Sequence, residues 1–458
     1  MNSAERLSGT AAKKARADIL SHMYSNQVGV NLGKGLADPY VPLLALQLDA
    51  TTPQLGWLQA VINLFPAVMQ VPWGKLSDFF RRRIPFLIVG GVMSFSLYFF
   101  MVGAINATHL IIIVAAQLCI GSMMIPTWSA LVGDVTSVAN RGSVMSKFFA
   151  VATLASVVGT VIGGALIPTN EPSSVKRFGL PFFMAGFIGI FGSVILYEIM
   201  EQKRRLYASP RTLFKFSLKS FVFISDLKEN IHFRNLVVLN TFFNFIMSII
   251  WPILILTYIG VLRASAFELG IITVTATGST LFFQTKVGKL LDLIGPIPQI
   301  LISRFAFISV PIVYALATEV WHIYALNIAL GLATAMSNVA FFAYIMDVSP
   351  EDRKGEYFAV YNTLIGVATF VGAIIGGYLA LFFENQYGPI SLNALDDPAT
   401  RSRLVVALGA LYAISAVGRA IGSVWFLKLK DPVKYPETLR GLVKKSFSRW
   451  RLKRATQK

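Results

Sequence analysis

Long apolar segments separated by short polar ones run through most of the chain. A helix that crosses a bilayer needs about 20 consecutive apolar residues, and two sets of six segments come near that length. The first set lies at 23–48, 54–73, 84–105, 109–132, 144–168 and 180–200. The second set lies at 236–262, 267–285, 298–318, 322–346, 356–383 and 404–427. The pattern predicts an all-α membrane protein with twelve transmembrane helices.

The two sets carry the same short motifs in the same order, 213 to 214 residues apart. Gly-Lys-Leu-Ser-Asp at 74–78 recurs as Gly-Lys-Leu-Leu-Asp at 288–292. A group of glycines recurs as well, at 159, 163 and 164 and then at 372, 376 and 377. A chain built as two parallel copies of a membrane half is typical of many secondary transporters, whose site lies between the halves near mid-bilayer. We therefore expect two pseudo-symmetric halves of six helices each.

These landmarks divide the chain into tails, halves and a linker. We expect an amino tail at 1–22, a first half at 23–200, a linker at 201–235, a second half at 236–427 and a basic carboxyl tail at 428–458. Only 14% of the residues are charged and the mean hydropathy is +0.63, whereas soluble chains carry about 25% charged residues. The composition therefore predicts a protein embedded in the lipid bilayer.

The net charge of +18 follows the expected topology. Lys and Arg gather in both tails, in the linker and in the loop at 81–83, and basic loops near span ends resist translocation. We therefore expect a multi-pass protein of the plasma membrane with both termini in the cytoplasm. Because the charge forms no compact basic domain, the composition argues against nucleic-acid binding.

The segment after the second span carries a family motif. Transporters of the major facilitator superfamily have a loop there that reads roughly G-x-L-x-D-[RK]-x-G-[RK]-[RK], and this chain matches it at Gly74, Leu76, Asp78, Arg82 and Arg83, though not at Phe79 and Arg81. The second copy matches at Gly288, Leu290, Asp292 and Gly295. Over nearly all of its length the chain resembles a twelve-span member of this superfamily. The resemblance implies cytoplasmic gating contacts made by Gly74, Asp78, Arg82, Arg83, Asp134, Arg141, Gly288, Asp292, Asp347 and Arg353.

Four polar residues of the first span share one helical face in this interpretation. Gln27, Asn31, Lys34 and Asp38 are spaced four, three and four residues apart. A charge at a helix centre costs about 2.5 to 3.5 kcal/mol on insertion scales, so such residues usually face a cavity, pair, or both. We expect Lys34 and Asp38 to take part in transport, with a structural ion pair as the alternative.

Other polar residues inside spans are candidates for the lining of a pathway. They are Asn63, Gln117, Asn240, Asn244, Trp251, Asn338, Tyr361 and Asn362. Spans one and seven are equivalent in the repeat, so their polar faces are expected to meet across the pathway. For any single Asn or Gln, a hydrogen bond between helices is the alternative.

Two further groups are expected to be structural. Lys147, Arg304 and Arg419 lie within two to three turns of the cytoplasmic span ends, where long basic side chains can snorkel to the interface, and we expect them to do so. The glycines of spans five and eleven are expected to form small-residue surfaces for close helix approach.

The resemblance also bears on direction and energy source. Drug-exporting members carry G-P-x-x-G-G in span five, whereas this chain has no proline between Gly159 and Gly163. Proton-coupled members often carry R-x-x-x-G in span four, whereas this chain has Gln117 before Gly121. The stretch at 35–42 nevertheless resembles the drug-efflux branch.

We therefore expect a secondary active transporter that moves a small organic solute by alternating access. Proton-coupled export is favoured, with Asp38 as the proton carrier. The alternative is a symporter or facilitator for uptake of an anionic or sugar-like solute, because Lys34 can bind an anion. A transporter-like receptor or a lipid-moving protein is a third reading. Four histidines, one cysteine and no phosphate-cradling glycine loop argue against an enzyme, and we expect a monomer that uses no metal and no cofactor.

Overall fold

The computed structural model describes residues 3–80, 82–136, 141–168, 175–198, 230–351, 353–387 and 398–430. The regular structure of these residues is helical, and no β-strand occurs among them. Eleven helical segments are long and apolar enough to cross a membrane, and helix α1 with the turns that follow it supplies the twelfth. The all-α, twelve-helix fold expected from the sequence is confirmed.

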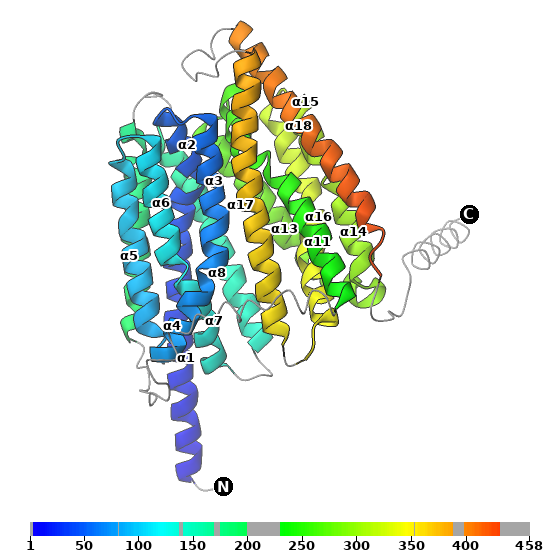
Figure 1. Cartoon of the computed structure of the whole chain (residues 1–458). Helices are drawn as coiled ribbons and strands as arrows, with labels where there is room; N and C mark the ends of the chain where they lie inside the picture. The colour runs from blue at the N-terminus through cyan, green and yellow to red at the C-terminus, as the bar shows by residue number, and fades with distance from the viewer. Residues whose placement is uncertain are drawn as a thin grey trace, which may run out of the picture.

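The first six spans form one bundle, drawn in blue to green-cyan in Figure 1. Span one consists of α1 (Ser3–Ala37), the 3-10 turn η1 (Asp38–Tyr40) and α2 (Val41–Gln47). Spans two to six are α3 (Thr52–Val68) with α4 (Gln70–Phe80), α5 (Ile84–Val102), α6 (Ala107–Gly121) with α7 (Met124–Val135), α8 (Arg141–Leu166), and η2 (Val175–Phe178) with α9 (Gly179–Val194) and η3 (Ile195–Glu198). The start of α1 projects from one end of the bundle, here called the amino-tail end (Figure 1).

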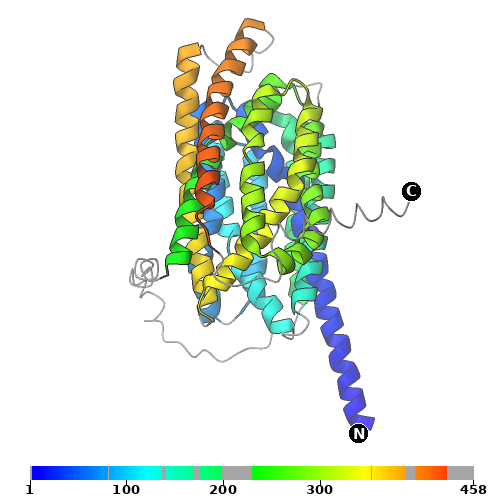
Figure 2. The same ribbon diagram turned by 90° about the vertical axis from the view of Figure 1, so that its right-hand side faces the viewer.

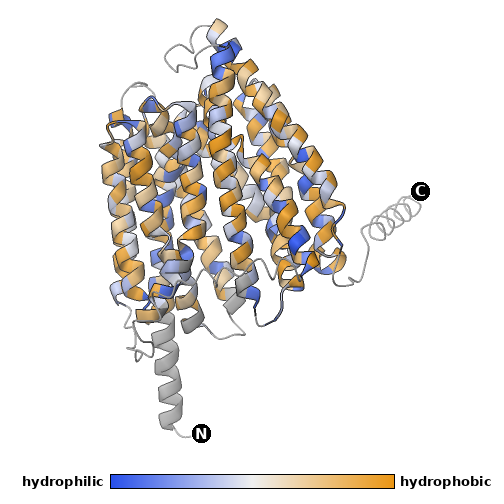
Figure 3. Ribbon diagram, viewed as in Figure 1, coloured by the Kyte–Doolittle hydropathy of each residue, from blue (hydrophilic) through white to orange (hydrophobic). Residues whose placement is uncertain are grey.

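The second bundle stands beside the first (Figures 1 and 2). Span seven consists of α11 (Ile231–Ser248), η6 (Trp251–Ile253), α12 (Leu254–Leu256) and the π-helical segment η7 (Thr257–Val261). The remaining spans are α13 (Ala266–Ile294), α14 (Pro296–Ala306) with α15 (Ser309–Leu316), α16 (Val320–Val348), α17 (Lys354–Tyr387) and α18 (Pro398–Phe426). Helix α11 thus includes residues 231–235, which the sequence analysis assigned to the linker. Hydrophobic residues predominate along the helices of both bundles (Figure 3).

Span one is broken where its polar spacing predicts a continuous helix. Helix α1 ends at Ala37, and Asp38 opens η1 directly before Pro39. Proline lacks an N–H group and its ring clashes with the carbonyl four residues earlier, which disrupts a helix at this point. The expected single stripe therefore holds for the three residues within α1, and Asp38 belongs to the next turn.

Span seven breaks at the equivalent place. Trp251-Pro252 stands 213 residues after Asp38-Pro39 (251 − 38 = 213), and it opens η6 just as Asp38-Pro39 opens η1. The repeat seen in the sequence is thus also a repeat of helix breaks. Each break begins with a distinctive side chain, a carboxylate in the first half and an indole in the second.

Small residues let equivalent helix pairs pack closely in both halves. A Cβ atom at Gly163 of α8 would lie 2.5 Å from the carbonyl oxygen of Leu36 in α1. At the equivalent position of α17, a Cβ atom at Gly376 would lie 2.0 Å from the carbonyl oxygen of Ile249, just past α11. Only glycine permits such backbone contact, which confirms the expected role of these glycines.

The two halves meet at the end of the molecule opposite to the amino-tail end. A Cβ atom at Gly56 of α3 would lie 3.0 Å from the Cα of Gly377 in α17. A Cβ atom at Gly164 of α8 would lie 2.9 Å from the carbonyl oxygen of Ala266 in α13. Gly164 and Gly377 are repeat equivalents (377 − 164 = 213), so each half presents the same glycine to the other half.

Candidate functional site

Asp38 has a tyrosine as its hydrogen-bond partner. The hydroxyl of Tyr98, on α5, donates to Oδ1 of Asp38. Tyr98 is 0% exposed, whereas the Asp38 side chain is exposed. Gln117 of α6 is buried beside the same hydroxyl. The structure therefore brings together two residues predicted from sequence, Asp38 and Gln117, through a third that sequence reasoning missed.

Lys34 does not pair with Asp38. Within the described part of the chain no ion pair joins the two side chains, and the Lys34 charge acts on the carboxylate only through space. Farther along α1, Asn31 Nδ2 donates to the backbone oxygen and to Oε1 of Gln27, at 2.8 and 3.1 Å. Asp38 is thus left as a carboxylate whose hydrogen-bond partner is neutral.

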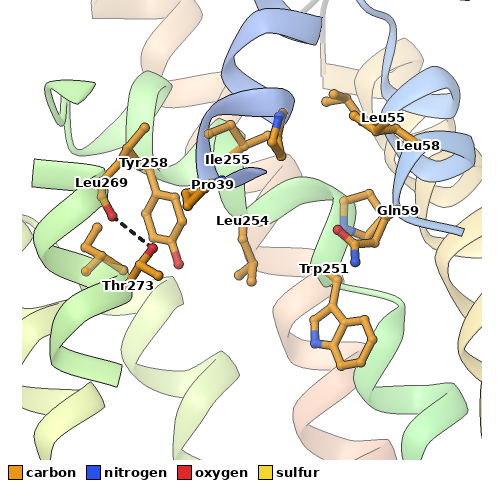
Figure 4. Close-up of a pocket in the computed structure, with 13 residues that line it drawn as sticks. Pro39, Leu55, Leu58, Gln59, Trp251, Leu254, Ile255, Tyr258, Leu269 and Thr273 are labelled. Carbon is orange, nitrogen blue, oxygen red and sulfur yellow. Dashed lines mark hydrogen bonds between the residues drawn. The ribbon is translucent and has the colours of Figure 1, made fainter. Parts of the chain in front are cut away.

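A cavity of about 170 Å³ lies between the halves next to this turn. Its lining is mostly apolar, and polar groups come from Gln59, Trp251, Tyr258 and Thr273 (Figure 4). Pro39 and Trp251 both line it, so the breaks of spans one and seven both reach this cavity, whereas the meeting of the two polar faces stays a prediction. The turn that carries Asp38 therefore forms part of the boundary between the halves.

Asn63 lies one turn from this cavity on α3. Its Oδ1 accepts from Nε2 of Gln59 at 3.3 Å. Its Nδ2 is buried and has no hydrogen-bond partner among the described residues. Such an unsatisfied donor is uncommon in a folded protein, which keeps Asn63 a candidate for contact with a solute or water.

A second cavity, of about 360 Å³, lies within the second half and is called the second-half cavity here. Four predicted residues line it, namely Asn240, Asn244, Asn338 and Tyr361. Asn240 Nδ2 donates to the Tyr361 hydroxyl at 2.5 Å, and Asn244 Nδ2 donates to the Asn240 carbonyl at 2.8 Å. Asn362 is exposed on α17 and is not among the lining residues.

Two arginines expected to snorkel are instead buried in the second half, so that prediction is wrong. Arg304 is 3% exposed and Arg419 is 1% exposed. The Arg304 guanidinium lies 4.5, 5.3, 4.6 and 5.6 Å from the ring centroids of Phe243, Phe307, Phe341 and Phe426. Counting turns from a span end ignores the direction of the side chain, and three of these rings come from helices far from Arg304 in the sequence, namely Phe243, Phe341 and Phe426. Lys147, by contrast, has an exposed side chain.

A third cavity, of about 530 Å³, lies between the halves toward the amino-tail end. Helix α8 contributes Phe149 and Thr153 to it, α13 contributes residues from Ala276 to Gln284, and α16 contributes Thr334. Thr334 also lines the second-half cavity, so the two cavities adjoin. The molecule is thus closed at the opposite end and hollow toward the amino-tail end.

The family motif lies on helix ends as well as on loops. Gly74 lies within α4, and Gly288 and Asp292 lie within α13. A Cβ atom at Gly74 would make an ordinary contact with Pro126 at 3.5 Å, whereas no described atom lies within 4 Å of one at Gly288. The second copy of the motif therefore borders open space.

The charged residues of the predicted gate are only partly described. Arg83 Nη1 donates to Ser77 Oγ at 2.9 Å, and the Arg353 guanidinium lies 5.8 Å from the centroid of the Tyr357 ring. Exposed side chains are found at Arg82, Asp292 and Asp347. The side chains of Asp78, Asp134 and Arg141 lie outside the described residues. The gating role of this set stays a prediction.

Comparison with known proteins assigns the chain to a family. The family model for the Major Facilitator Superfamily matches residues 23–246 and 236–457, one match for each half. An uncharacterised MFS-type transporter of Methanocaldococcus jannaschii is 24% identical over 359 residues, covering 78% of this chain and 90% of the relative. The multidrug resistance protein MdtG of Proteus mirabilis is 24% identical over 364 residues, covering 76% and 85%.

A solved structure shows the same fold. It is a bacterial homolog of the human lysosomal transporter Spinster in an inward-facing, unoccupied conformation, with a TM-score of 0.69 and 15% identity, covering 92% of this chain and 99% of that one. Two repeated halves, twelve helices, cavities between the halves and a family model that matches each half agree with one another. The chain belongs to the major facilitator superfamily of membrane transporters.

Proposed function

We propose that the protein exports small amphipathic organic solutes in exchange for protons, with Asp38 as the proton-binding group. The observation that carries this proposal is the Asp38 carboxylate, which lies at a helix break inside a membrane-spanning bundle and accepts from Tyr98. Because no ion pair holds this carboxylate within the described residues, a proton can neutralise it without leaving a cation unpaired. Asp38 is therefore suited to carry a proton.

The position of Asp38 links its charge to the contact between the halves. The next residue, Pro39, lines the cavity that the two halves share. A charged carboxylate needs water or a donor, whereas a neutral one tolerates a closed, apolar environment. Protonation therefore biases the equilibrium between the state that is open at the amino-tail end and the state that is open at the opposite end. Proton-coupled alternating access requires such a bias.

Direction rests on topology and on one relative. The basic tails support a cytoplasmic amino-tail end, which makes the described state one that opens to the cytoplasm and can load a solute for export. The multidrug resistance name of the Proteus relative supports the same direction. A reporter active only in the cytoplasm should work after Lys458 and fail at Asn393, and the reverse pattern would contradict this orientation.

Proteoliposomes with an imposed pH gradient test the proposal. A fluorescent amphipathic dye should move against its own gradient when protons flow the other way, and it should stop when the pH gradient is collapsed. Dye or solute movement in the same direction as the protons would support the alternative, a symporter for uptake. Movement that ignores the pH gradient would identify a facilitator. No movement of any solute in a broad panel would favour a receptor.

A further inference from the structure

The second half buries two guanidinium groups without an acidic partner. Neither Arg304 nor Arg419 forms an ion pair with an Asp or Glu among the described residues, and the charge of Arg304 acts on Arg419 through space. Uncompensated charge inside a membrane protein is strongly unfavourable, and embedded charges usually pair or face an aqueous cavity. Two adjacent cations therefore need an explanation in terms of a counter-charge or of many acceptors.

Arg419 has such acceptors. Its Nε donates to Ser415 Oγ at 3.1 Å, its Nη1 to the Phe307 carbonyl at 2.8 Å and its Nη2 to the Met247 carbonyl at 3.4 Å. These contacts direct the N–H groups of Arg419 into its own bundle. Arg419 is thus explained by structure alone.

Arg304 lacks them. A guanidinium has five N–H donors, and within the described residues Arg304 uses one nitrogen, Nη2, to donate to Ser337 Oγ. Its Nε is buried and has no hydrogen-bond partner. The surrounding phenylalanine rings stabilise the positive charge by cation–π attraction, but their faces do not replace hydrogen-bond acceptors. Arg304 therefore keeps unused donor capacity.

The Arg304 residue borders a cavity of suitable size and chemistry. Arg304 lines the second-half cavity, whose volume of about 360 Å³ falls in the range of small-molecule sites. Ser337, Asn338 and Tyr361 supply polar groups to the lining, and Phe342 and Phe358 supply apolar walls. Asn240 also lines the cavity, and its buried Oδ1 has no hydrogen-bond partner among the described residues, so this acceptor suits a donor group of a solute and not its anionic group. A cation, amides and aromatic rings together fit an organic anion.

We propose that the second-half cavity binds the anionic group of the transported solute, a carboxylate that accepts hydrogen bonds from Arg304 while its apolar body packs on Phe342 and Phe358. This inference rests on the proposed transport function and narrows its substrate class to amphipathic organic anions. The solute enters through the third cavity, of about 530 Å³, which shares the lining residue Thr334 with the second-half cavity. Binding supplies the acceptors that Arg304 lacks and neutralises one of the two buried cations.

Equilibrium binding to the purified full-length protein tests the inference. The probes are 1-naphthoate, its uncharged methyl ester and inorganic phosphate. We expect Arg304→Gln to weaken binding of 1-naphthoate at least about tenfold, because charge-assisted hydrogen bonds are the strong ones, and to leave binding of the ester nearly unchanged. Arg304→Lys should recover part of the loss. Lys147→Gln removes one positive charge at an exposed site and serves as the matched control, with parental affinity.

Several outcomes would overturn the inference. One is that Arg304→Gln and the parent protein bind 1-naphthoate with equal affinity. Another is that the parent protein binds 1-naphthoate and its methyl ester equally well. The others are that the parent protein does not bind 1-naphthoate, or that it binds phosphate only. If Arg304→Gln does not yield folded protein, Asn338→Leu replaces it in the test. The Asn338 side chain is exposed and lines the cavity, so its replacement should weaken the binding of 1-naphthoate as well. The binding measurement needs no pH gradient, so it stays valid if the proposed proton coupling fails. Likewise, a failure to bind 1-naphthoate leaves the test of proton coupling valid.

Discussion

Arg419 connects three separated segments of the second half, and we therefore expect it to contribute to the stability of the fold. Two of its acceptors, the carbonyls of Met247 and Phe307, lie where α11 and α14 end. Arg419→Gln leaves them without their donor, so we expect the free energy of unfolding to fall by about 1 to 3 kcal/mol. Heat unfolding in detergent micelles measures the change. Arg304→Gln should lose less stability, and an equal loss in both variants would contradict this division of roles.

His22 connects span one to span six at the amino-tail end. Its Nδ1 lies 2.8 Å from the Asp18 carbonyl oxygen and its Nε2 lies 2.6 Å from Oε2 of Glu198. The Asp18 carbonyl first, and the Glu198 carboxylate second, raise the pKa of His22 above 6.5. A raised pKa in the folded state gives stability that is fully present below the unfolded value and is lost as the pH rises through the folded value.

We therefore expect a pH-dependent effect of His22→Gln. The variant should be less stable than the parent below about pH 6.5 and equal to it in alkaline solution. The difference should stay within about 1 kcal/mol, because the pair is largely exposed. Thermal unfolding of both proteins across the pH range is the measurement. A difference that is constant with pH would show that the contact does not depend on the charge of His22.

At the residue scale, the candidates were polar residues that stand out in an apolar span. The structure brings Asp38 and Gln117 together and places three of the asparagines in the lining of the second-half cavity, while their role in transport stays a prediction. Tyr98 was missed because it stands between Leu97 and Phe99, whereas Tyr361 has Asn362 beside it. The burial of Arg304 was missed because its ring partners come from α11, α16 and α18, and no local pattern in the sequence reports that meeting.

Prolines and glycines shape the elements that carry the site. The stripe predicted on span one ignored Pro39, which ends the helix at Ala37 and moves Asp38 to its own turn. The ion pair between Lys34 and Asp38, which is the alternative to a transport role, does not occur among the described residues. The glycines of spans five and eleven, in contrast, were correctly predicted, because small residues at a spacing of four on a helix indicate close packing whatever the partner is.

Gly163 and Gly376 should respond in the same way to added side chains, since they are equivalent in the repeat. A Cβ atom at either position would overlap a backbone carbonyl at 2.5 or 2.0 Å. Overpacking of this kind costs about 1 to 3 kcal/mol, so Gly163→Val and Gly376→Val should both lower the thermal midpoint. Gly409→Ala on α18 is the control, because no described atom lies within 4 Å of its added Cβ. Unchanged midpoints in the valine variants would contradict the described packing.

On the scale of the whole molecule, the twelve helices and two halves were predictable and the open state was not. Helix number follows from apolar length, and the halves follow from the repeat. The proposed alternating access requires the same helices to form either open state with a small difference in free energy, and the sequence does not indicate which state is lower. The structure adds that the halves touch through Gly56 and Gly377 at one end and enclose cavities at the other.

Bulk at this glycine contact should shift the molecule toward its other state. Gly377→Leu cannot be accommodated against Gly56, whose Cα would lie 2.9 Å from a Cβ atom at position 377. A penalty of about 1 to 3 kcal/mol in the described state corresponds to roughly 5- to 150-fold in the equilibrium constant. Thr277 lines the third cavity, of about 530 Å³. When Thr277→Cys is made in a Cys119→Ser background, a thiol reagent added from the amino-tail side should label this cysteine more slowly in Gly377→Leu than in the parent. Labelling as fast as in the parent would show that this contact does not close the molecule.

The central claim is that proton binding at Asp38 drives transport. Its most direct test compares Asp38→Asn with the parent protein in proteoliposomes under two conditions, an imposed pH gradient and solute exchange without one. Asparagine keeps a hydrogen-bond acceptor for the Tyr98 hydroxyl but cannot bind or release the proton. The account predicts that Asp38→Asn loses gradient-driven transport and keeps exchange. Gradient-driven transport by Asp38→Asn equal to that of the parent would contradict it.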